Sequence, residues 1–422
     1  MKYYLRTFGC RANHYDTEAV RAMVAAAGHE VVESVAEADV AVFNSCAVTT
    51  DAEAELRKVV RRAAKDRPGL RSVVMGCASA LDDQRPVQLQ ARSLPSVEHV
   101  VSGADLVAIA SALELPMLPA NALTRSQAGT RALLRIQDGC DEHCTFCATT
   151  MARGANRSRP ISALTEEARE LAERHAEIVL TGIHIGTYGQ DIETSLGVLV
   201  ERLVRDVPRV RFRLSSIEAT ELDGRLMDLL VHAPMRLAPY VHAPLQSGSD
   251  RLLKRMGRHW YTSASYATAL ESLAQRMPIF GLGADVITGF PGETDDDHAQ
   301  TRALIERLPF TYLHVFPFSL RPATPAERLS GRVDSTIADA RAAELRGIAI
   351  EKAKAYASSR ASGDADVIVI GDGGKKHGLT GDFLQVDLTD PFVARGERFD
   401  ARLSEGLHGL AATKCCVREV NH

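Results

Sequence analysis

Short apolar runs alternate with amphipathic segments along the first hundred residues. The runs YYLRTF, VAVFN and SVVMG predict buried strands, while HYDTEAVRAMVAAAG and DAEAELRKVVRRAAK have the apolar spacing of helices. Gly28 is placed to end the first helix, and a Pro68-Gly69 turn follows the second. Because strands that alternate with helices form parallel sheets covered on both faces, residues 1–115 are expected to form a doubly wound parallel α/β sheet.

The alternation resumes after a stretch without pattern, from Pro116 to about Thr130, which predicts a linker. Six strand candidates then alternate with helical segments: ALLRIQ, EIVLTG, VRFRLSS, LAPYVHAP, GLGADVITG and TYLHVFPF. Such units predict an open or partial (βα)6 barrel over residues 126–358. Its functional loops would lie at the carboxyl ends of the strands.

The last part of the chain changes character again. The segments DADVIVIGD, FLQVDLTD, RFDARLSE and TKCCVREV have the pattern of short strands, and glycine-rich turns such as GDGG separate them. Residues 361–422 are therefore expected to form a small all-β barrel or half-barrel, a shape that is common among nucleic-acid binders.

Composition is compatible with this domain organisation, and it adds information only at one basic segment. A chain of 422 residues with 45% hydrophobic and 25% charged residues fits two or three globular domains. No apolar run approaches the length of a membrane span, and the start MKYYLRTFGC is too short and too polar for a secretory signal. We therefore expect a cytoplasmic protein with no membrane partner. The net charge of −4 is uninformative, but the basic segment LRKVVRRAAKDRPGLR fits either a solvated helix face or an RNA contact.

Eight cysteines carry the strongest chemical signal, because in a reducing cytosol they are metal ligands or buried thiols more often than disulfides. We expect the adjacent Cys415 and Cys416 to be small apolar strand residues. The segment GCDEHCTFC places Cys140, Cys144 and Cys147 just after the first barrel strand. Three thiolates there can hold a cubane cluster and leave one iron open to an outside ligand. Zinc is the alternative, although its sites normally close four positions.

A second set of three cysteines is spread along the sequence, but the predicted fold brings them to one edge of the sheet. Cys10, Cys46 and Cys77 each come directly after a predicted parallel strand of the N-terminal sheet. The carboxyl ends of such strands form the ligand crevice of an open α/β sheet. A second three-thiolate cluster is therefore predicted, with buried core cysteines as the alternative.

Several motifs together resemble one enzyme family. They are GCRANHYDTEA, NSCAVTT, RIQDGCDEHCTFC, LTGIHIGTYG, HAPLQSGSDRLLKRM, ITGFPGET and GLTGDFLQV. With the two cysteine triads, they are similar to the methylthiotransferase branch of the radical S-adenosylmethionine superfamily. The resemblance covers nearly the whole chain and implies a cluster-binding N-terminal domain, a radical domain and a TRAM-like β-domain.

The resemblance also implies an activity. The stretches VTTDAEAELRKVVRRA, LTGIHIGTYG and RLSSIE look most like the enzymes that add a methylthio group to C2 of N6-threonylcarbamoyladenosine at tRNA position 37. Enzymes acting on N6-isopentenyladenosine tRNA or on a ribosomal protein are the alternatives. The implied cofactors are two [4Fe–4S] clusters and S-adenosylmethionine. The implied partners are the tRNA anticodon arm and an electron donor such as flavodoxin or ferredoxin, and the chain is expected to be a monomer.

Further site residues follow from the resemblance or from their places in loops. Residues expected to contact S-adenosylmethionine lie near the first cluster or at strand ends: Phe146, Thr181, Gly182, Ser215, Glu218, Gly289 and Gly292. Residues expected to contact RNA or the substrate adenine are mostly basic: Arg153, Arg157, Arg159, His184, Arg321, Lys375, Lys376 and Phe383. The alternative for each is a turn former, a loop anchor or a solvated surface residue.

Two other classes of protein remain open at this point. An iron–sulfur electron carrier would explain the clusters, but it would need neither a βα barrel nor an RNA-type tail. A zinc-dependent RNA-binding protein would explain the tail and the arginines, but it would not explain two triads that each lack a fourth ligand.

Overall fold

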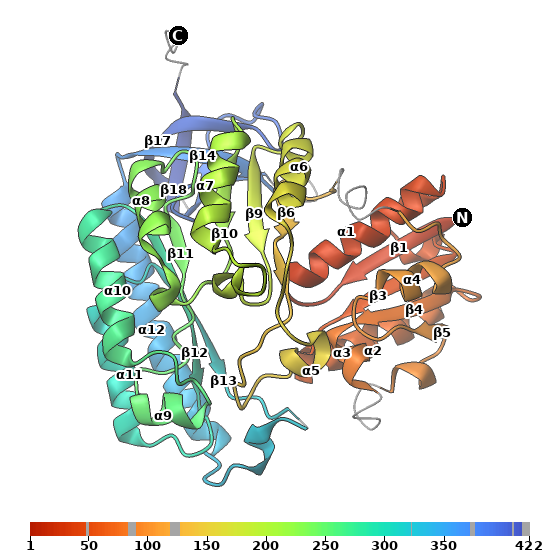
Figure 1. Cartoon of the computed structure of the whole chain (residues 1–422), viewed down its shortest axis with the longest axis horizontal. Helices are drawn as coiled ribbons and strands as arrows, with labels where there is room; N and C mark the ends of the chain where they lie inside the picture. Colours follow the sequence, from red (N-terminus) through yellow and green to blue (C-terminus); the bar gives the residue numbers. More distant parts are fainter. Residues whose placement is uncertain are drawn as a thin grey trace.

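The computed structural model describes residues 1–47, 50–82, 90–118, 127–321, 323–371, 376–406 and 409–415. Lys375 and Cys416, both singled out from the sequence, lie outside these ranges. Within the described ranges, no helix has the length and apolar character that a membrane crossing needs. The chain folds into an N-terminal sheet domain, a central partial barrel and a C-terminal barrel (Figure 1).

The N-terminal domain is a parallel sheet of five strands in the order β2-β1-β3-β4-β5, as the alternating pattern predicts. Its strands are β1 (Lys2–Thr7), β2 (Glu30–Val32), β3 (Val40–Ser45), β4 (Arg71–Gly76) and β5 (Val97–Val100). Alternate residues of β3 face opposite sides, so that Val40 and Val42 join one apolar core while Ala41 and Phe43 join the other.

Helices cover both faces of this sheet. Helices α1 (Arg11–Ala26) and α4 (Leu106–Ala112) pack on one face, and α2 (Thr50–Asp66) and α3 (Cys77–Asp82) pack on the other. Short 3-10 turns complete the domain: η1 (Val35–Glu37) and η2 (Ala91–Ser93). The predicted doubly wound arrangement is confirmed, and its strand order reverses between β1 and β3. A ligand crevice is expected at such a reversal.

The central domain is a partial barrel of two parallel three-stranded sheets, β10-β9-β6 and β11-β12-β13. Isolated bridges join the two sheets between β10 and β11. The strands are β6 (Ala132–Arg135), β9 (Glu177–Thr181), β10 (Arg211–Leu214), β11 (Tyr240–His242), β12 (Gly281–Thr288) and β13 (Tyr312–Pro317). The six strands agree with the expected (βα)6 arrangement.

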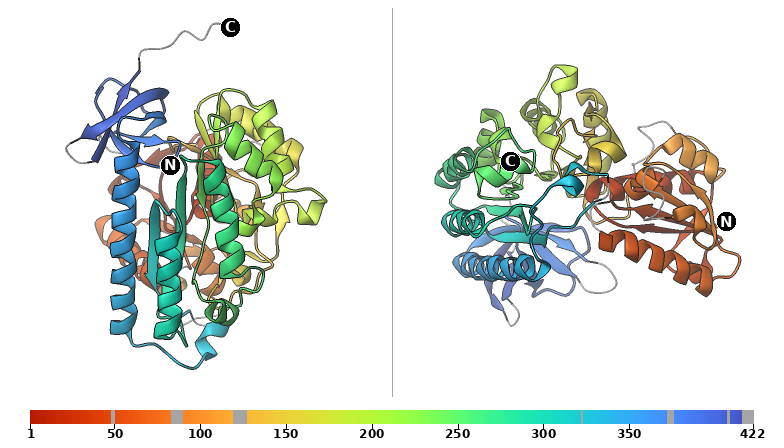
Figure 2. Two further views of the ribbon diagram at one scale, coloured as in Figure 1. Left: turned by 90° about the vertical axis from the view of Figure 1, so that its left-hand side faces the viewer. Right: turned by 90° about the horizontal axis from the view of Figure 1, so that it is seen from below.

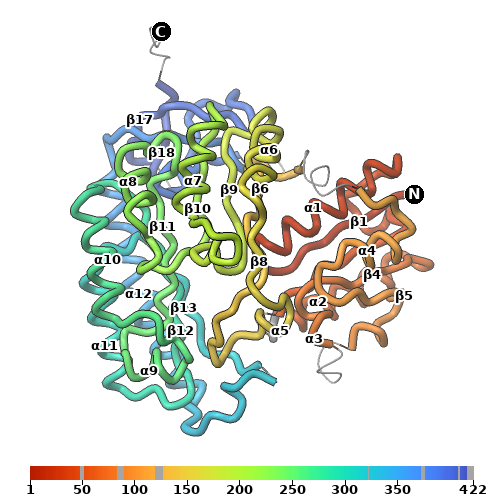
Figure 3. Tube along the Cα trace, viewed as in Figure 1, coloured from red at the N-terminus to blue at the C-terminus, as the bar shows by residue number. Residues whose placement is uncertain are grey.

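Helices surround the outside of this partial barrel. They are α6 (Ile161–Ala172), α7 (Leu196–Asp206), α8 (Gly224–His232), α9 (Asp250–Arg255), α10 (Ser263–Arg276), α11 (Asp295–Arg307) and α12 (Ser335–Arg360). Shorter elements lie in the loops: β7 (Gln137–Asp138), α5 (Thr149–Arg153), β8 (Arg157–Ser158), η4 (Ile185–Thr187), η5 (Gln190–Ile192), η6 (Ala219–Glu221) and η7 (Pro325–Arg328). The barrel is open between β6 and β13, and helix α1 lies beside β6 at this opening (Figure 3).

The C-terminal domain is a closed barrel in the strand order β14-β15-β16-β18-β17. Its strands are β14 (Asp364–Ile370), β15 (His377–Thr380), β16 (Gln385–Leu388), β17 (Arg398–Gly406) and β18 (Gly409–Lys414). The predicted all-β tail is confirmed. The prediction for Cys415 is wrong, because this residue lies just past β18 and is exposed. The long helix α12 leads directly into this barrel (Figure 2).

The C-terminal barrel covers the amino-terminal ends of the central strands through buried charges. Arg211 donates to the backbone oxygen and the carboxylate of Asp366, at 3.0 and 2.7 Å. Arg213 donates to the backbone oxygens of Gly381 and Thr380, at 3.0 and 3.1 Å. Both guanidinium groups also bind the fully buried carboxylate of Glu177, which is thus the counter-ion shared by the two arginines that reach the C-terminal barrel.

Glu177 is ionised at neutral pH. Burial alone would raise its pKa, but Arg211 and Arg213 outweigh burial and hold the pKa well below its usual range. A third arginine, Arg131, lies 3.3 Å from the same carboxylate.

We predict that Glu177→Gln lowers the free energy of unfolding by about 3–5 kcal/mol, because the change leaves buried guanidinium groups without their counter-ion. Urea denaturation followed by circular dichroism measures this effect. The control is Glu201→Gln, which breaks the exposed pair with Arg225 and should cost less than about 1 kcal/mol. Equal denaturation midpoints for the two variants would contradict the shared counter-ion.

Candidate active site

The first cysteine triad lies at the carboxyl edge of the N-terminal sheet. Cys10 caps helix α1, Cys46 follows β3, and Cys77 follows β4 as the first residue of α3. Gly9 brings two of them together, because a Cβ atom on this glycine would lie only 2.6 Å from the Cys46 Sγ. The three cysteines therefore lie at the same edge of the sheet, beside the point where the strand order reverses.

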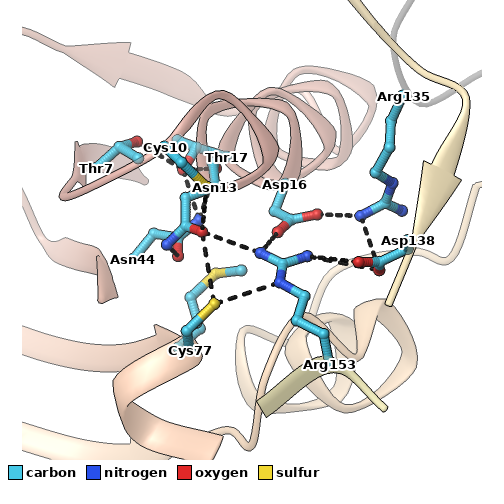
Figure 4. A network of polar contacts seen from close by, with 12 residues as sticks. Thr7, Cys10, Asn13, Asp16, Thr17, Asn44, Cys77, Arg135, Asp138 and Arg153 are labelled. Carbon is cyan, nitrogen blue, oxygen red and sulfur yellow. Dashed lines mark hydrogen bonds and ion pairs between the residues drawn. The ribbon is translucent and has the colours of Figure 1, made fainter. Parts of the chain in front are cut away.

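A buried asparagine, Asn13, organises this edge (Figure 4). Its Oδ1 lies 3.5 Å from the Cys10 Sγ and 3.7 Å from the Cys77 Sγ. Its Nδ2 donates to the backbone oxygens of Phe8 and Ser45, at 3.2 and 2.7 Å. One side chain on the first turn of α1 thus joins two cysteines to the ends of two strands. The sequence reasoning missed Asn13, although its position three residues after Cys10 is a signal that could have found it.

The second triad lies on the loop after β7. Gly139 lets this loop pass close to its neighbour, since a Cβ there would lie 1.9 Å from the Ala155 backbone oxygen. The Cys140 N–H donates to the Gly154 oxygen at 3.0 Å, and the Cys147 N–H donates to the Cys144 oxygen at 3.1 Å. The loop is therefore held by backbone hydrogen bonds before any cluster contributes.

Each of two sulfurs in this triad faces a cation that is itself paired. The Cys144 Sγ lies 3.5 Å from Arg258, which also binds the Glu218 carboxylate. The Cys140 Sγ lies 3.8 Å from the His184 Nδ1, and the His184 Nε2 lies 2.8 Å from Glu221. Burial alone would lower the pKa of His184, but Cys140 and Glu221 outweigh it and raise the pKa to about 10. Cations at these positions favour thiolate over thiol.

Without a metal, burial keeps the thiols of Cys77 and Cys144 protonated. It raises the pKa of Cys77 to about 12, although Arg153 opposes the shift, and it raises the pKa of Cys144 to about 12, although Arg258 opposes it. A metal centre would supply the positive charge that makes the thiolates stable.

The spacing of the sulfurs separates a cluster from a single zinc ion. Three thiolates on one zinc, at about 2.3 Å each, lie about 3.8 Å apart, whereas ligands of a cubane each bind a different iron and lie farther apart. Among the described residues, the one group of ligand-type side chains whose atoms all lie within 4.8 Å is His242, Asp285 and His314. Neither cysteine triad is that compact in the described part of the chain, which argues against a single zinc ion held by the three sulfurs of either triad.

Arg153 contacts a sulfur of the first triad from the segment that follows the second triad (Figure 4). It ends helix α5, which begins two residues after Cys147, and its Nε donates to the Cys77 Sγ at 3.3 Å. Its other nitrogens bind Asp16 at 2.7 Å, Asn13 at 3.0 Å and Asp138 at 3.3 Å. The expectation that Arg153 contacts RNA is corrected, because its side chain is only 3% exposed and its donors are used inside the protein.

Two other predicted RNA contacts are also occupied within the protein. Arg159 donates to Glu167 at 2.6 Å and to the Tyr15 hydroxyl at 3.2 Å. Arg321 is buried and pairs with Glu53 of the N-terminal domain at 3.4 Å. These arginines hold the domains together. Only Arg157 of the three in ARGANRSRP is exposed, with 60% of its side chain accessible.

The strand-end residues expected near S-adenosylmethionine do gather at the mouth of the partial barrel. Thr181 ends β9, Ser215 follows β10, and Glu218 reaches the Cys144 sulfur through Arg258. Packing alone also requires a glycine at position 182, because a Cβ there would lie 2.7 Å from the Gln137 side-chain oxygen.

The remaining expected cofactor contacts pack against protein. A Cβ on Gly289 would lie 2.3 Å from Ala338, and one on Gly292 would lie 2.7 Å from Arg255. Phe146 packs edge-on against Phe290, with 6.4 Å between ring centroids. These contacts fit the loop-anchoring and turn roles that the sequence left as alternatives, and the expected contacts of these three residues with S-adenosylmethionine stay predictions.

The tail residues are not the open stacking surface that the sequence suggested. Phe383 packs on Tyr240 of the partial barrel, 4.5 Å between ring centroids, and Arg213 lies over its ring at 5.3 Å. Lys376 is exposed, but its ammonium group donates to the backbone oxygens of Pro391 and Val393. Phe383 is thus an interdomain anchor.

Comparison with known proteins places this arrangement in a family. Residues 2–98 match the uncharacterized protein family UPF0004, and residues 134–305 match the radical SAM superfamily. The chain is 35% identical over 372 residues to the threonylcarbamoyladenosine tRNA methylthiotransferase MtaB of Bacillus subtilis, covering 83% of this chain and 81% of that protein. The chain belongs to the radical S-adenosylmethionine methylthiotransferase family.

Another member is similar over a comparable length. The tRNA-2-methylthio-N(6)-dimethylallyladenosine synthase of Bartonella henselae is 30% identical over 398 residues, which is 87% of this chain and 86% of that protein. Among solved structures, the radical S-adenosylmethionine methyltransferase TsrM of Kitasatospora setae matches with a TM-score of 0.56 at 15% identity, over 77% of this chain and 75% of that one. The latter likeness shows the fold alone. As a radical S-adenosylmethionine methylthiotransferase, the protein uses S-adenosylmethionine and a [4Fe–4S] cluster.

We predict that Arg153→Lys lowers the free energy of unfolding of this methylthiotransferase by about 1–3 kcal/mol, because an ammonium group cannot replace the forked hydrogen bonds to Asp16 and Asp138. The matched control is Arg157→Lys, four residues away and exposed, which should change the stability by no more than about 0.5 kcal/mol. Urea denaturation of both variants measures the difference. An Arg153→Lys midpoint equal to that of the control would rule out the buried bridge.

Proposed function

We propose that this protein converts N6-threonylcarbamoyladenosine at position 37 of tRNA into its 2-methylthio derivative. The observation that carries the proposal is the pair of three-cysteine sites, one on the N-terminal sheet and one on the partial barrel, which Arg153 joins. The similarity to the Bacillus subtilis enzyme gives the substrate class. The Bartonella henselae relative keeps N6-dimethylallyladenosine as a second candidate substrate.

Two [4Fe–4S] clusters are part of the proposal. Cys140, Cys144 and Cys147 would hold the cluster that binds S-adenosylmethionine, and an auxiliary cluster would be held by the triad Cys10, Cys46 and Cys77. When bound, these groups supply the reductive cleavage, the sulfur and the methyl group that methylthiolation needs.

The side chains around the triads would position these groups and balance their charge. Arg258, His184 and Arg153 each present a cation or donor to a cysteine sulfur, which stabilises anionic thiolate ligands. At the barrel mouth, Thr181, Gly182, Ser215 and Glu218 are proposed to contact S-adenosylmethionine. Because these groups sit on rigid strand ends, the geometry would exist before the cofactor binds.

The substrate would approach from the open side of the partial barrel. We propose division into domains 1–115, 126–358 and 361–422, with the tRNA anticodon arm contacting the exposed Arg157 and the C-terminal barrel. A small electron-transfer protein such as flavodoxin or ferredoxin would supply electrons in the cytoplasm, where tRNA is found, and the enzyme would act as a monomer.

We predict two clusters with separable ligand sets. Replacing Cys140, Cys144 and Cys147 together by Ala should remove about half of the bound iron and abolish 5′-deoxyadenosine formation, since an open iron is needed to bind the cofactor. Replacing Cys10, Cys46 and Cys77 by Ala should remove the other half and leave cofactor cleavage in place. Iron assays and product chromatography after anaerobic reconstitution measure both. Full iron in the second variant would refute the auxiliary cluster.

The substrate class is tested by offering the reconstituted enzyme two tRNAs, one with N6-threonylcarbamoyladenosine and one with N6-isopentenyladenosine at position 37. A site that pairs with a carboxylate arm rejects the apolar analogue strongly, because its buried polar groups would be left unpaired. We expect the 2-methylthio nucleoside, detected by mass spectrometry, from the first tRNA only. Methylthiolation of only the isopentenylated tRNA would contradict the substrate assignment and leave the cluster assignment intact.

A further inference from the structure

An open pocket of about 420 Å³ lies where the three domains meet. Its walls come from helix α1, from strands β6 and β9, and from the C-terminal barrel. Three arginines, two histidines and one glutamate line it: Arg11, Arg131, Arg395, His14, His377 and Glu18. Cationic side chains therefore outnumber the single acidic one.

The acidic groups near this pocket are already engaged. Glu18 accepts a hydrogen bond from the Ala128 N–H at 3.1 Å and pairs with Arg21 at 3.5 Å. Arg131 shares the carboxylate of Glu177 with two other arginines. Neither carboxylate is available to neutralise a further guanidinium group.

Arg11 is the side chain that this arrangement leaves without a counter-ion. It is half-buried, and among the described residues it donates no side-chain hydrogen bond and makes no ion pair. It lines the pocket together with Arg131, which precedes β6, and helix α1 packs against β6 at the opening of the barrel. A half-buried guanidinium that faces other cations favours binding of an anion.

The position of Arg11 ties the pocket to the proposed chemistry. The residue directly follows Cys10, a proposed ligand of the auxiliary cluster, so one wall of the pocket and the first triad share the start of helix α1. Arg153 and Arg321, which were expected to contact RNA or the substrate adenine, are buried in pairs with Asp16 and Glu53.

We propose that this pocket binds an anionic oxygen group of the substrate tRNA, with Arg11 as the anchoring residue. The inference rests on the proposed function. A carboxylate on the threonylcarbamoyl arm and a phosphate of the RNA backbone both present paired oxygens that fit the guanidinium fork. The ligand is an anionic oxygen group in either case, and the experiment below distinguishes the carboxylate from the phosphate.

The test compares Arg11→Gln and Arg11→Lys with the wild-type enzyme, all reconstituted and checked for equal iron content. The matched control is Arg225→Gln, which removes one positive charge from the outer helix α8, where Arg225 pairs with Glu201. Fluorescence anisotropy gives Kd for two anticodon-arm RNAs, one with N6-threonylcarbamoyladenosine and one with unmodified adenosine at position 37. We expect Arg11→Gln to weaken binding about 10- to 100-fold, the effect of losing a hydrogen bond to a charged group, and Arg11→Lys to restore part of it.

Two results would support the pocket and identify the ligand. A loss confined to the threonylcarbamoyl RNA identifies the carboxylate. An equal loss on both RNAs, with a shallower salt dependence, identifies a phosphate. If Arg11→Gln does not load iron, Arg395→Gln removes a cation from the opposite wall and should weaken binding in the same pattern.

Unchanged Kd values for both RNAs in iron-loaded Arg11→Gln, or in Arg395→Gln where it replaces that variant, would overturn the inference. Failure of the proposed function has a different signature: the wild-type enzyme would not methylthiolate the threonylcarbamoyl RNA, whatever residue stands at position 11.

Discussion

The buried ion pair between Arg153 and Asp16, 2.7 Å long, joins two domains at the point where their cysteine triads approach each other. Arg153 belongs to the partial barrel and Asp16 to the first helix of the N-terminal domain. Taking both groups out of water is costly, and the pair is stable because Asp138 and Arg135 extend it into a network. The geometry between the two triads depends on this network, since Arg153 ends helix α5, which begins two residues after Cys147, and its Nε donates to the Cys77 Sγ at 3.3 Å.

A second charged network sets the position of the C-terminal barrel. Arg211 and Arg213 extend from the partial barrel to Asp366, Thr380 and Gly381, and Phe383 packs on Tyr240 beside them. The C-terminal barrel therefore closes the amino-terminal end of the central strands in addition to any contact with RNA. Removing it would expose buried charge, so a truncated chain would lose more than RNA affinity.

The sequence was sufficient for the architecture and for the places of the six cysteines, because both depend on local signals; their roles as cluster ligands stay a prediction. Strand and helix periods are visible in the chain, and a cysteine within three residues of the end of each of three parallel strands must lie at one sheet edge. The arginines could not be assigned in this way. Arg153 and Arg157 belong to the same short basic segment, yet one is buried and the other exposed. What separates them is Asp16, far away in the sequence, and only the packing of two domains brings that carboxylate to Arg153. Arg11 could not be singled out from the sequence either, because what marks it is that it has no ion-pair partner among the described residues.

The proposed function requires two cubane clusters that lie side by side across one domain interface. Electron paramagnetic resonance of the reduced, reconstituted protein tests it most directly, because two neighbouring paramagnetic clusters broaden or split each other's signals. The account predicts that the wild-type spectrum differs from the sum of the spectra of the two triple-cysteine variants. A wild-type spectrum equal to that sum, or to the spectrum of one variant alone, would contradict it.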